Sequence, residues 1–189
     1  NSSWNPTANG RVRAISIYNN EIYVGGDFTF IGGYDRNKLA KLNDTNGAAD
    51  LNWNPNPNNA IYTLAVDESN VFVGGAFTSI DSYTINRLAK LYRTSGNVDN
   101  SWIPAPNNTV YSMLLDGNDL YVGGDFLTIG SQTINYFSKL DKLSGSSDAN
   151  FDLKINSRAH EIKLKGNNLF LAGFFNKINN SPQKSVAKF

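Results

Sequence analysis

The residues best suited to contacting a ligand occupy equivalent places in a repeated pattern. Tyr62 and Tyr111 lie 49 residues apart, and Arg13 and His160 hold the corresponding places one repeat before and one repeat after them. An aromatic ring supplies contact area and its polar tip supplies direction, so this row could bind a sugar or a peptide. Packing between neighbouring sheets is the alternative interpretation.

Three tryptophans follow the same spacing. Trp4, Trp53 and Trp102 are 49 residues apart, and Phe151 takes the fourth place. Indole rings can stack on glycans, but regular recurrence at a repeat boundary favours first a place in the core.

Groups that could carry catalysis are few. The only histidine is His160, and no Ser-His-Asp arrangement can be argued around it. Asp27 and Asp125 share a repeat position at which the other two copies carry Ala76 and Phe174, so the two carboxylates make a poor acid/base pair. We expect turn or backbone hydrogen bonding for these carboxylates, and no enzymatic activity.

Neither a metal site nor a cofactor site is predicted. The chain has no cysteine, which excludes thiol catalysis and cysteine metal sites. The oxygen-rich "DGND" at 116–119 aligns with "YNNE", "DESN" and "KGNN", which are typical of hairpin turns rather than calcium loops. The glycine segments lack the helix and the Lys-Ser/Thr ending of a phosphate loop.

Four lysines occupy equivalent positions in the repeats. In a closed ring they would form a basic circle that could hold an anion or an acidic glycan. The favoured alternative is that these lysines face water on an outer strand and discourage edge aggregation. They are Lys41, Lys90, Lys139 and Lys188.

Composition limits the class of partner. The chain has 189 residues, 40% hydrophobic and 17% charged, with a formal net charge of +1. So small a charge gives no field to gather nucleic acid. No apolar run approaches the roughly 18 residues of a membrane span.

The whole chain is organised by the 49-residue repeat, which holds without a gap. Each copy contains four short strand signals, in the first copy around "RVRAISIY", "EIYVGGDF", "KLAKL" and "AADLNWNP". Four antiparallel strands in about 40 to 50 residues are typical of a β-propeller blade. We predict an all-β single domain, 1–189, of four four-stranded blades, near 4–52, 53–101, 102–150 and 151–189, with an outer strand at 1–6.

A glycine pair recurs on the second predicted strand of each repeat. "YVGGDFT" returns as "FVGGAFT" and "YVGGDFL", and in worn form as "FLAGFFN". Glycine is costly inside a strand, so we interpret the pair as a packing device that lets the next blade approach closely. The glycines are Gly25, Gly26, Gly74, Gly75, Gly123 and Gly124, and the aromatic filling beyond them is Phe28, Phe77, Phe126 and Phe175.

The sequence leaves three alternatives for how the blades close into a ring. The 1–6 strand could complete the blade that ends in "SVAKF", which gives a closed four-bladed ring. The repeats could instead assemble between chains, or belong to a larger propeller. The fourth repeat carries Glu161 and Lys163 on the face that is small in the other copies, which suits a polar cap or a salt-bridged joint.

The pattern "WNPNPNNAIYTLAV…VFVGGAFTSI…NRLAKL" resembles the bacterial secreted propeller repeats known as delta-sixty repeats. The resemblance covers nearly the whole chain and implies an extracellular or cell-surface bacterial protein, without implying a reaction. We therefore expect a non-enzymatic interaction or structural module that binds a protein partner or self-associates. The alternative is a glycan-binding propeller with aromatic stacking residues.

Overall fold

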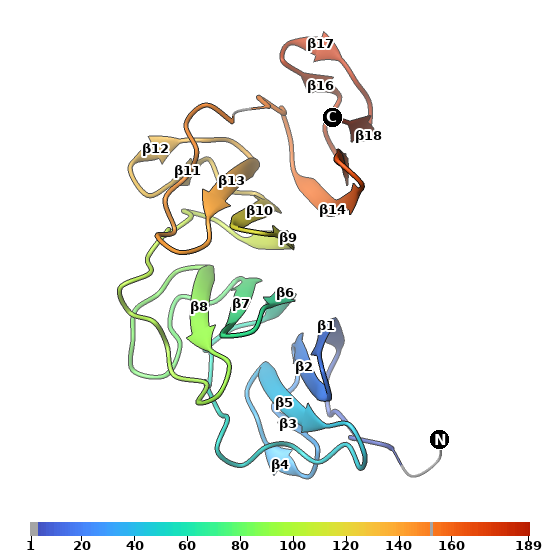
Figure 1. Cartoon of the computed structure of the whole chain (residues 1–189), viewed down its shortest axis with the longest axis vertical. Helices are drawn as coiled ribbons and strands as arrows, with labels where there is room; N and C mark the ends of the chain where they lie inside the picture. The colour runs from blue at the N-terminus through green and yellow to red at the C-terminus, as the bar shows by residue number, and fades with distance from the viewer. Residues whose placement is uncertain (1–3, 152) are drawn as a thin grey trace. The chain divides into compact units, whose positions relative to one another are not determined.

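The computed structural model describes residues 4–151 and 153–189. Within this part of the chain every regular element is a β-strand, and no helix is long and apolar enough to cross a membrane. The chain divides into two compact units, Asn1–Ser101 and Trp102–Phe189, each holding two repeats (Figure 1). The division coincides with a predicted repeat boundary.

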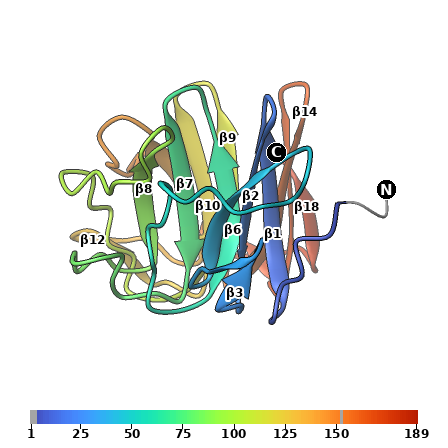
Figure 2. The same cartoon turned by 90° about the horizontal axis from the view of Figure 1, so that it is seen from below.

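Each repeat of the first unit forms a three-stranded antiparallel sheet, in the orders β1-β2-β5 and β6-β7-β8. Figure 2 shows β6 and β7 running side by side. A short hairpin, β3-β4, projects from the first repeat. The strands are β1 (Val12–Tyr18), β2 (Glu21–Gly26), β3 (Phe30–Ile31), β4 (Tyr34–Asp35), β5 (Leu39–Asn43), β6 (Ile61–Val66), β7 (Asn70–Gly75) and β8 (Leu88–Tyr92).

The second unit repeats this plan, with sheets β9-β10-β13 and β14-β15-β18 and the hairpins β11-β12 and β16-β17. The strands are β9 (Val110–Asp116), β10 (Asp119–Gly124), β11 (Thr128–Ile129), β12 (Gln132–Thr133), β13 (Phe137–Asp141), β14 (Ala159–Lys165), β15 (Asn168–Gly173), β16 (Lys177–Ile178), β17 (Ser181–Pro182) and β18 (Val186–Lys188).

The predicted fourth strand is reduced to a single bridge in the first three repeats. The bridges join Leu42 to Ala49, Leu91 to Val98 and Leu140 to Ser147. An aspartate then ends the pairing, because its carboxylate accepts a hydrogen bond from the amide two residues on. The distances are 3.0 Å at Asp50, 3.2 Å at Asp99 and 3.0 Å at Asp148.

The predicted outer strand at 1–6 lies partly outside the described residues. Residues 1–3 lie outside the described part, but Trp4 packs against the core of the first repeat and donates its Nε1–H to the Asn43 carbonyl at 3.1 Å. The Pro6 carbonyl accepts from the Gly32 amide at 2.6 Å. Residues 4–6 therefore pack on the first repeat.

The glycine pair marks a β-bulge in every first strand. Gly26 pairs with Val12 and Gly25 with Ala14, so the Cα register skips Arg13. The same shift skips Tyr62, Tyr111 and His160 in the Cα register of the other three repeats. A Cβ on Gly26 would lie 2.1 Å from the Arg11 carbonyl oxygen, so only glycine permits this approach. The first glycine faces the next repeat instead, since a Cβ on Gly25 would lie 2.5 Å from Ile61.

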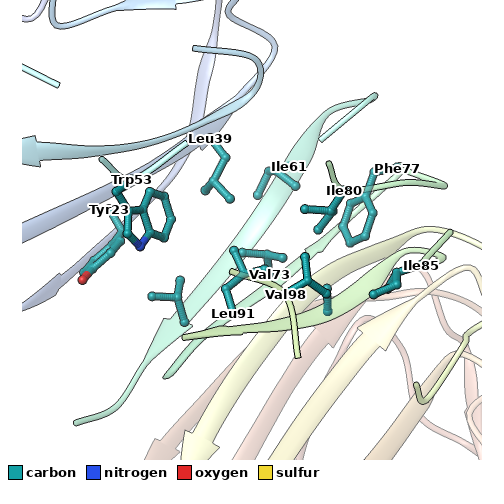
Figure 3. Packing of buried hydrophobic residues seen from close by; sticks show 12 residues of the cluster. Tyr23, Leu39, Trp53, Ile61, Val73, Phe77, Ile80, Ile85, Leu91 and Val98 are labelled. Atoms are coloured by element: carbon teal, nitrogen blue, oxygen red, sulfur yellow. The ribbon is translucent and has the colours of Figure 1, made fainter. Parts of the chain in front are cut away.

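The core of the first unit runs from one repeat into the next. Trp53 and Tyr23 meet edge to face with ring centroids 5.3 Å apart, and Leu39 lies beside them (Figure 3). Gly96 has φ +75° and lies flat against the Trp53 ring, where a Cβ would come within 3.1 Å. The filling phenylalanines Phe28, Phe77, Phe126 and Phe175 are all fully buried.

A recurrent asparagine, which sequence reasoning missed, fixes the loop after each second strand. The Asn58 side-chain oxygen accepts from the amides of Thr78 and Ser79 at 2.9 and 3.2 Å. The equivalent residues Asn9, Asn107 and Asn156 make the same pair of bonds. Because one side-chain oxygen accepts from two successive amides of the loop, it holds the loop in one conformation.

We expect Gly124→Ala to lower the free energy of unfolding by about 2–4 kcal/mol, because its Cβ would lie 2.1 Å from the Thr109 carbonyl oxygen. Gly117→Asn is the control: nothing lies within 4 Å of its Cβ, and Asn tolerates its φ of +57°. Urea unfolding of both variants measures the difference. Equal stability of the two variants would contradict this account of the glycine pair.

Candidate functional site

The bulge determines where the predicted binding residues lie. Arg13, Tyr62, Tyr111 and His160 are the residues skipped in the pairing of the four first strands with the second strands. A bulge bends its strand and re-aims the extra side chain, which is why bulges recur beside binding sites. The glycine pair thus serves the site indirectly, by positioning this row.

In the first unit Arg13 and Tyr62 come together. Arg13 donates from Nε and Nη2 to the two carboxylate oxygens of Asp27, at 2.8 and 2.7 Å. Its guanidinium carbon lies 4.8 Å from the centroid of the Tyr62 ring. The two-point ion pair fixes the guanidinium plane, and the ring stacks on that plane.

The Asp27 carboxyl is thereby held in its charged form. The hydrogen bonds from Arg13, which outweigh partial burial, lower the pKa of Asp27 below its ordinary value. A carboxyl with a lower pKa in the folded state stabilises the fold above its unfolded pKa, about 3.9. That contribution is lost as the pH falls through the folded pKa.

In the second unit Arg158 takes the central place. It forms a two-point ion pair with Asp125, and its guanidinium carbon lies 4.1 Å from the Tyr111 ring centroid and 5.7 Å from that of Phe174. His160 meets Tyr111 edge to face at 5.9 Å and stacks on Phe174 at 6.2 Å.

This second cluster borders a shallow hollow of about 330 Å³ lined by His160 and Phe174. Phe174 is 67% exposed, so an aromatic face is open to a partner there. Sequence reasoning missed Arg158 and Phe174. Only two of the four repeats carry an aspartate after the glycine pair, and each of these aspartates has an arginine partner. That restriction was the signal that could have revealed Arg158.

The sequence analysis expected turn or backbone hydrogen bonding for the carboxylates of Asp27 and Asp125, and this prediction was wrong. Both carboxylates are paired with arginine side chains. Each aspartate directly follows the glycine pair. Its arginine partner is the bulged residue Arg13 of the same repeat for Asp27, and Arg158, just before β14 of the next repeat, for Asp125.

The tryptophans lie away from both clusters. Trp53 is fully buried and Trp102 is 1% exposed, so neither offers a ring face to a glycan. Gly145 lies against Trp102 as Gly96 lies against Trp53. Trp4 is half-buried and bonded to Asn43.

The lysine register does not face water in the first three repeats, contrary to the favoured prediction. Lys90 and Asp99 pair at 2.7 Å with both side chains 11% exposed, and Lys139 pairs with Asp148 at 2.9 Å. Lys41 lies 2.7 Å from Glu21 and 3.5 Å from Asp50. Each lysine thus contacts the aspartate that ends the outer bridge of its own repeat.

Glu21 also joins two repeats of the first unit. It accepts hydrogen bonds from Tyr23 at 2.7 Å and from Arg93, whose guanidinium lies 4.9 Å from the Tyr18 ring. Burial raises the pKa of Glu21, but the hydrogen bonds from Lys41, Tyr23 and Arg93 outweigh it and leave the pKa below its ordinary value.

Comparison with known proteins agrees with the fold. Residues 19–52 match the model of a family described as a domain of unknown function (DUF5122), a beta-propeller. No curated protein matches the chain.

Among solved structures, the computationally designed Ika4 protein is similar over 97% of this chain and 92% of its own, with a TM-score of 0.65 and 12% identity. The fold is that of a β-propeller. The WD40 propeller of Doa1 (TM-score 0.57, 13% identity) matches 85% of this chain and 46% of its own. The WD40 domain of Neurospora crassa Pan2 (TM-score 0.58, 11% identity) matches 95% of this chain and 50% of its own.

We expect Arg13→Gln to raise the pKa of Asp27, because the hydrogen bonds that lower it are removed. Carbon-13 NMR titration of the aspartate carboxyls measures this directly. Asp99 is the internal control. Burial raises its pKa, and the hydrogen bonds from Lys90 and Ser101 outweigh that effect, so its titration should not change. An unchanged Asp27 titration would contradict the geometry of the first cluster.

Proposed function

We propose that this protein is a non-catalytic binding module of a secreted or cell-surface bacterial protein, and that it contacts a protein partner through its two arginine–tyrosine clusters. One observation carries the proposal. The bulges present Tyr62 and Tyr111 where a neighbouring arginine, itself clamped by an aspartate, holds each ring.

The chemistry of these clusters suits a protein surface. Tyrosine and arginine are enriched among the residues that dominate protein–protein binding energy. Rings held in place in the free protein lose little entropy on binding. Because the aspartates neutralise the arginines, the clusters favour contact area over charge attraction.

A catalytic role is less favoured for the same reason. Both carboxylates of the clusters are engaged by arginines, and a lowered pKa makes Asp27 a poor proton donor near neutral pH. The extracellular location rests on the resemblance to secreted propeller repeats.

A glycan remains the alternative ligand for the same row. It is less favoured at these clusters, because an arginine already covers one face of each tyrosine ring and two of the tryptophans are buried.

The test is a random peptide library displayed on phage and selected on the wild-type protein. We expect selected peptides to lose about tenfold or more in affinity on Tyr62→Ala or on Tyr111→Ala, as for the central residues of an interface. Tyr34→Ala removes a ring that is 42% exposed outside the clusters and should change nothing. Peptides that bind all three variants alike would overturn the proposal.

A second candidate function, self-association, rests on an exposed apolar face of β1. Ile15 and Ile17 are 61% and 66% exposed, whereas Leu64 and Val66, their equivalents, pack against the core of the second repeat. We propose that two copies bury these isoleucines against each other. In a closed four-bladed ring the fourth repeat would cover them instead, but its small face carries the charged pair Glu161 and Lys163.

Sedimentation velocity over a concentration series tests self-association. We expect a dimer for the wild type and a monomer for Ile15→Lys/Ile17→Lys, with Leu51→Lys as the control, since Leu51 is equally exposed elsewhere in the unit. A wild-type monomer at every concentration would contradict the dimer and favour the closed ring.

A further inference from the structure

A groove of about 450 Å³ opens on the second repeat, away from the arginine–tyrosine clusters. Its volume lies within the range of small-molecule sites, about 300–1,000 Å³. The side chains that give it chemical character are Asn52, Asn54, Asp81, Tyr83, Tyr92 and Asn97.

The third repeat has the same groove with different side chains. Its lining includes Pro104 and Gly145, the equivalents of Pro55 and Gly96. The backbone of the repeat therefore produces the groove in both places. Gln132, however, stands at the place of Tyr83, and the fold does not demand the aromatic lining of the second repeat.

Two tyrosine rings flank this groove. Tyr83 is 40% exposed and Tyr92 is 46% exposed, at places where the third repeat has Gln132 and Asp141. The C–H face of a sugar ring packs well on an exposed aromatic face, and a tyrosine hydroxyl adds a hydrogen bond at its edge.

Polar side chains of the groove are available for hydrogen bonds. Within the part of the chain that the structure describes, the side chains of Asn54, Asp81 and Asn97 form no hydrogen bond or ion pair with the protein. Amides can donate and accept, and a carboxylate accepts at two oxygens, which matches the adjacent hydroxyl groups of a saccharide.

Asp81 holds a backbone conformation that suits glycine better. Its φ is +50°. Among the equivalent residues, Gly32 and Gly130 have φ +63° and +57°, and Asn179 has φ +48°. A side chain in this region carries a conformational cost, and such cost collects at functional sites. The carboxylate is thus present although the turn would form more easily without it.

Cations are absent from the residues that line this groove. The two nearest in sequence to its turns point elsewhere: Lys90 pairs with Asp99, and Arg93 with Glu21. A phosphate or an acidic sugar would find only Asp81, of like charge. We therefore propose that the groove of the second repeat binds a neutral oligosaccharide, stacked on Tyr83 and Tyr92 and oriented by Asp81 and the asparagines.

The test uses a panel of neutral di- and trisaccharides of gluco, galacto, manno and N-acetylglucosamine configuration. Saturation-transfer difference NMR detects binding at millimolar concentration, and amide shift mapping locates it. We expect one or more sugars to bind and to shift amides in 52–54, 81–83 and 92–97. Tyr83→Ala/Tyr92→Ala should weaken this binding at least tenfold.

Asp81→Gly separates folding from binding. Because glycine suits φ +50°, this variant should unfold at the same or a higher temperature than the wild type while losing at least tenfold in sugar affinity. Gln132→Ala, in the equivalent groove of the third repeat, should leave sugar binding unchanged. No binding by any sugar, or equal loss in Gln132→Ala, would overturn the proposal.

Discussion

The close approach between the last glycine of each second strand and the carbonyl just before the first strand of the same repeat is the constraint on which the rest depends. A Cβ at Gly26, Gly75, Gly124 or Gly173 would lie 2.1 or 2.2 Å from that oxygen. This contact allows the amide of the following residue to bond the same carbonyl, for example Asp27 to Arg11 at 2.8 Å. The first strand must then bulge, and one residue in each repeat is turned out of the ladder.

The arginine–aspartate ion pairs fix the side chains at the surface beside each bulge. A bulged residue alone would be a mobile side chain, but Asp27 and Asp125 follow the glycine pair and anchor an arginine each. The arginines in turn support Tyr62 and Tyr111. The glycine pair and the aspartate that follows it therefore both shape the strand and fix the aromatic side chains. At the outer bridges, the lysine–aspartate ion pairs fix the side chains of each repeat in the same way. Their charges are paired within the repeat.

The sequence predicted the repeat, the strands and the row of residues, because a period of 49 residues exposes every recurring constraint at once. The predicted fourth strand was wrong, since Asp50 and its equivalents end the pairing after a single bridge through a local turn that competes with a strand. The sequence analysis also missed Arg158, because the partner of Asp125 comes from the next repeat and not from its own. Pairing across repeats depends on distances that a periodic pattern does not encode. The groove of the second repeat was missed for the opposite reason, since Asp81 and Tyr92 differ from the residues at the equivalent places in the first and third repeats.

The central claim is that the glycine contact holds the aromatic row in place, and the ring-current shift of Arg158 tests it most directly. In the wild type the guanidinium lies 4.1 Å from the Tyr111 ring centroid, so proton NMR should show its Cδ protons shifted upfield. Gly124→Ala should lose this shift while Gly117→Asn keeps it. An Arg158 shift that survives in Gly124→Ala would contradict the account.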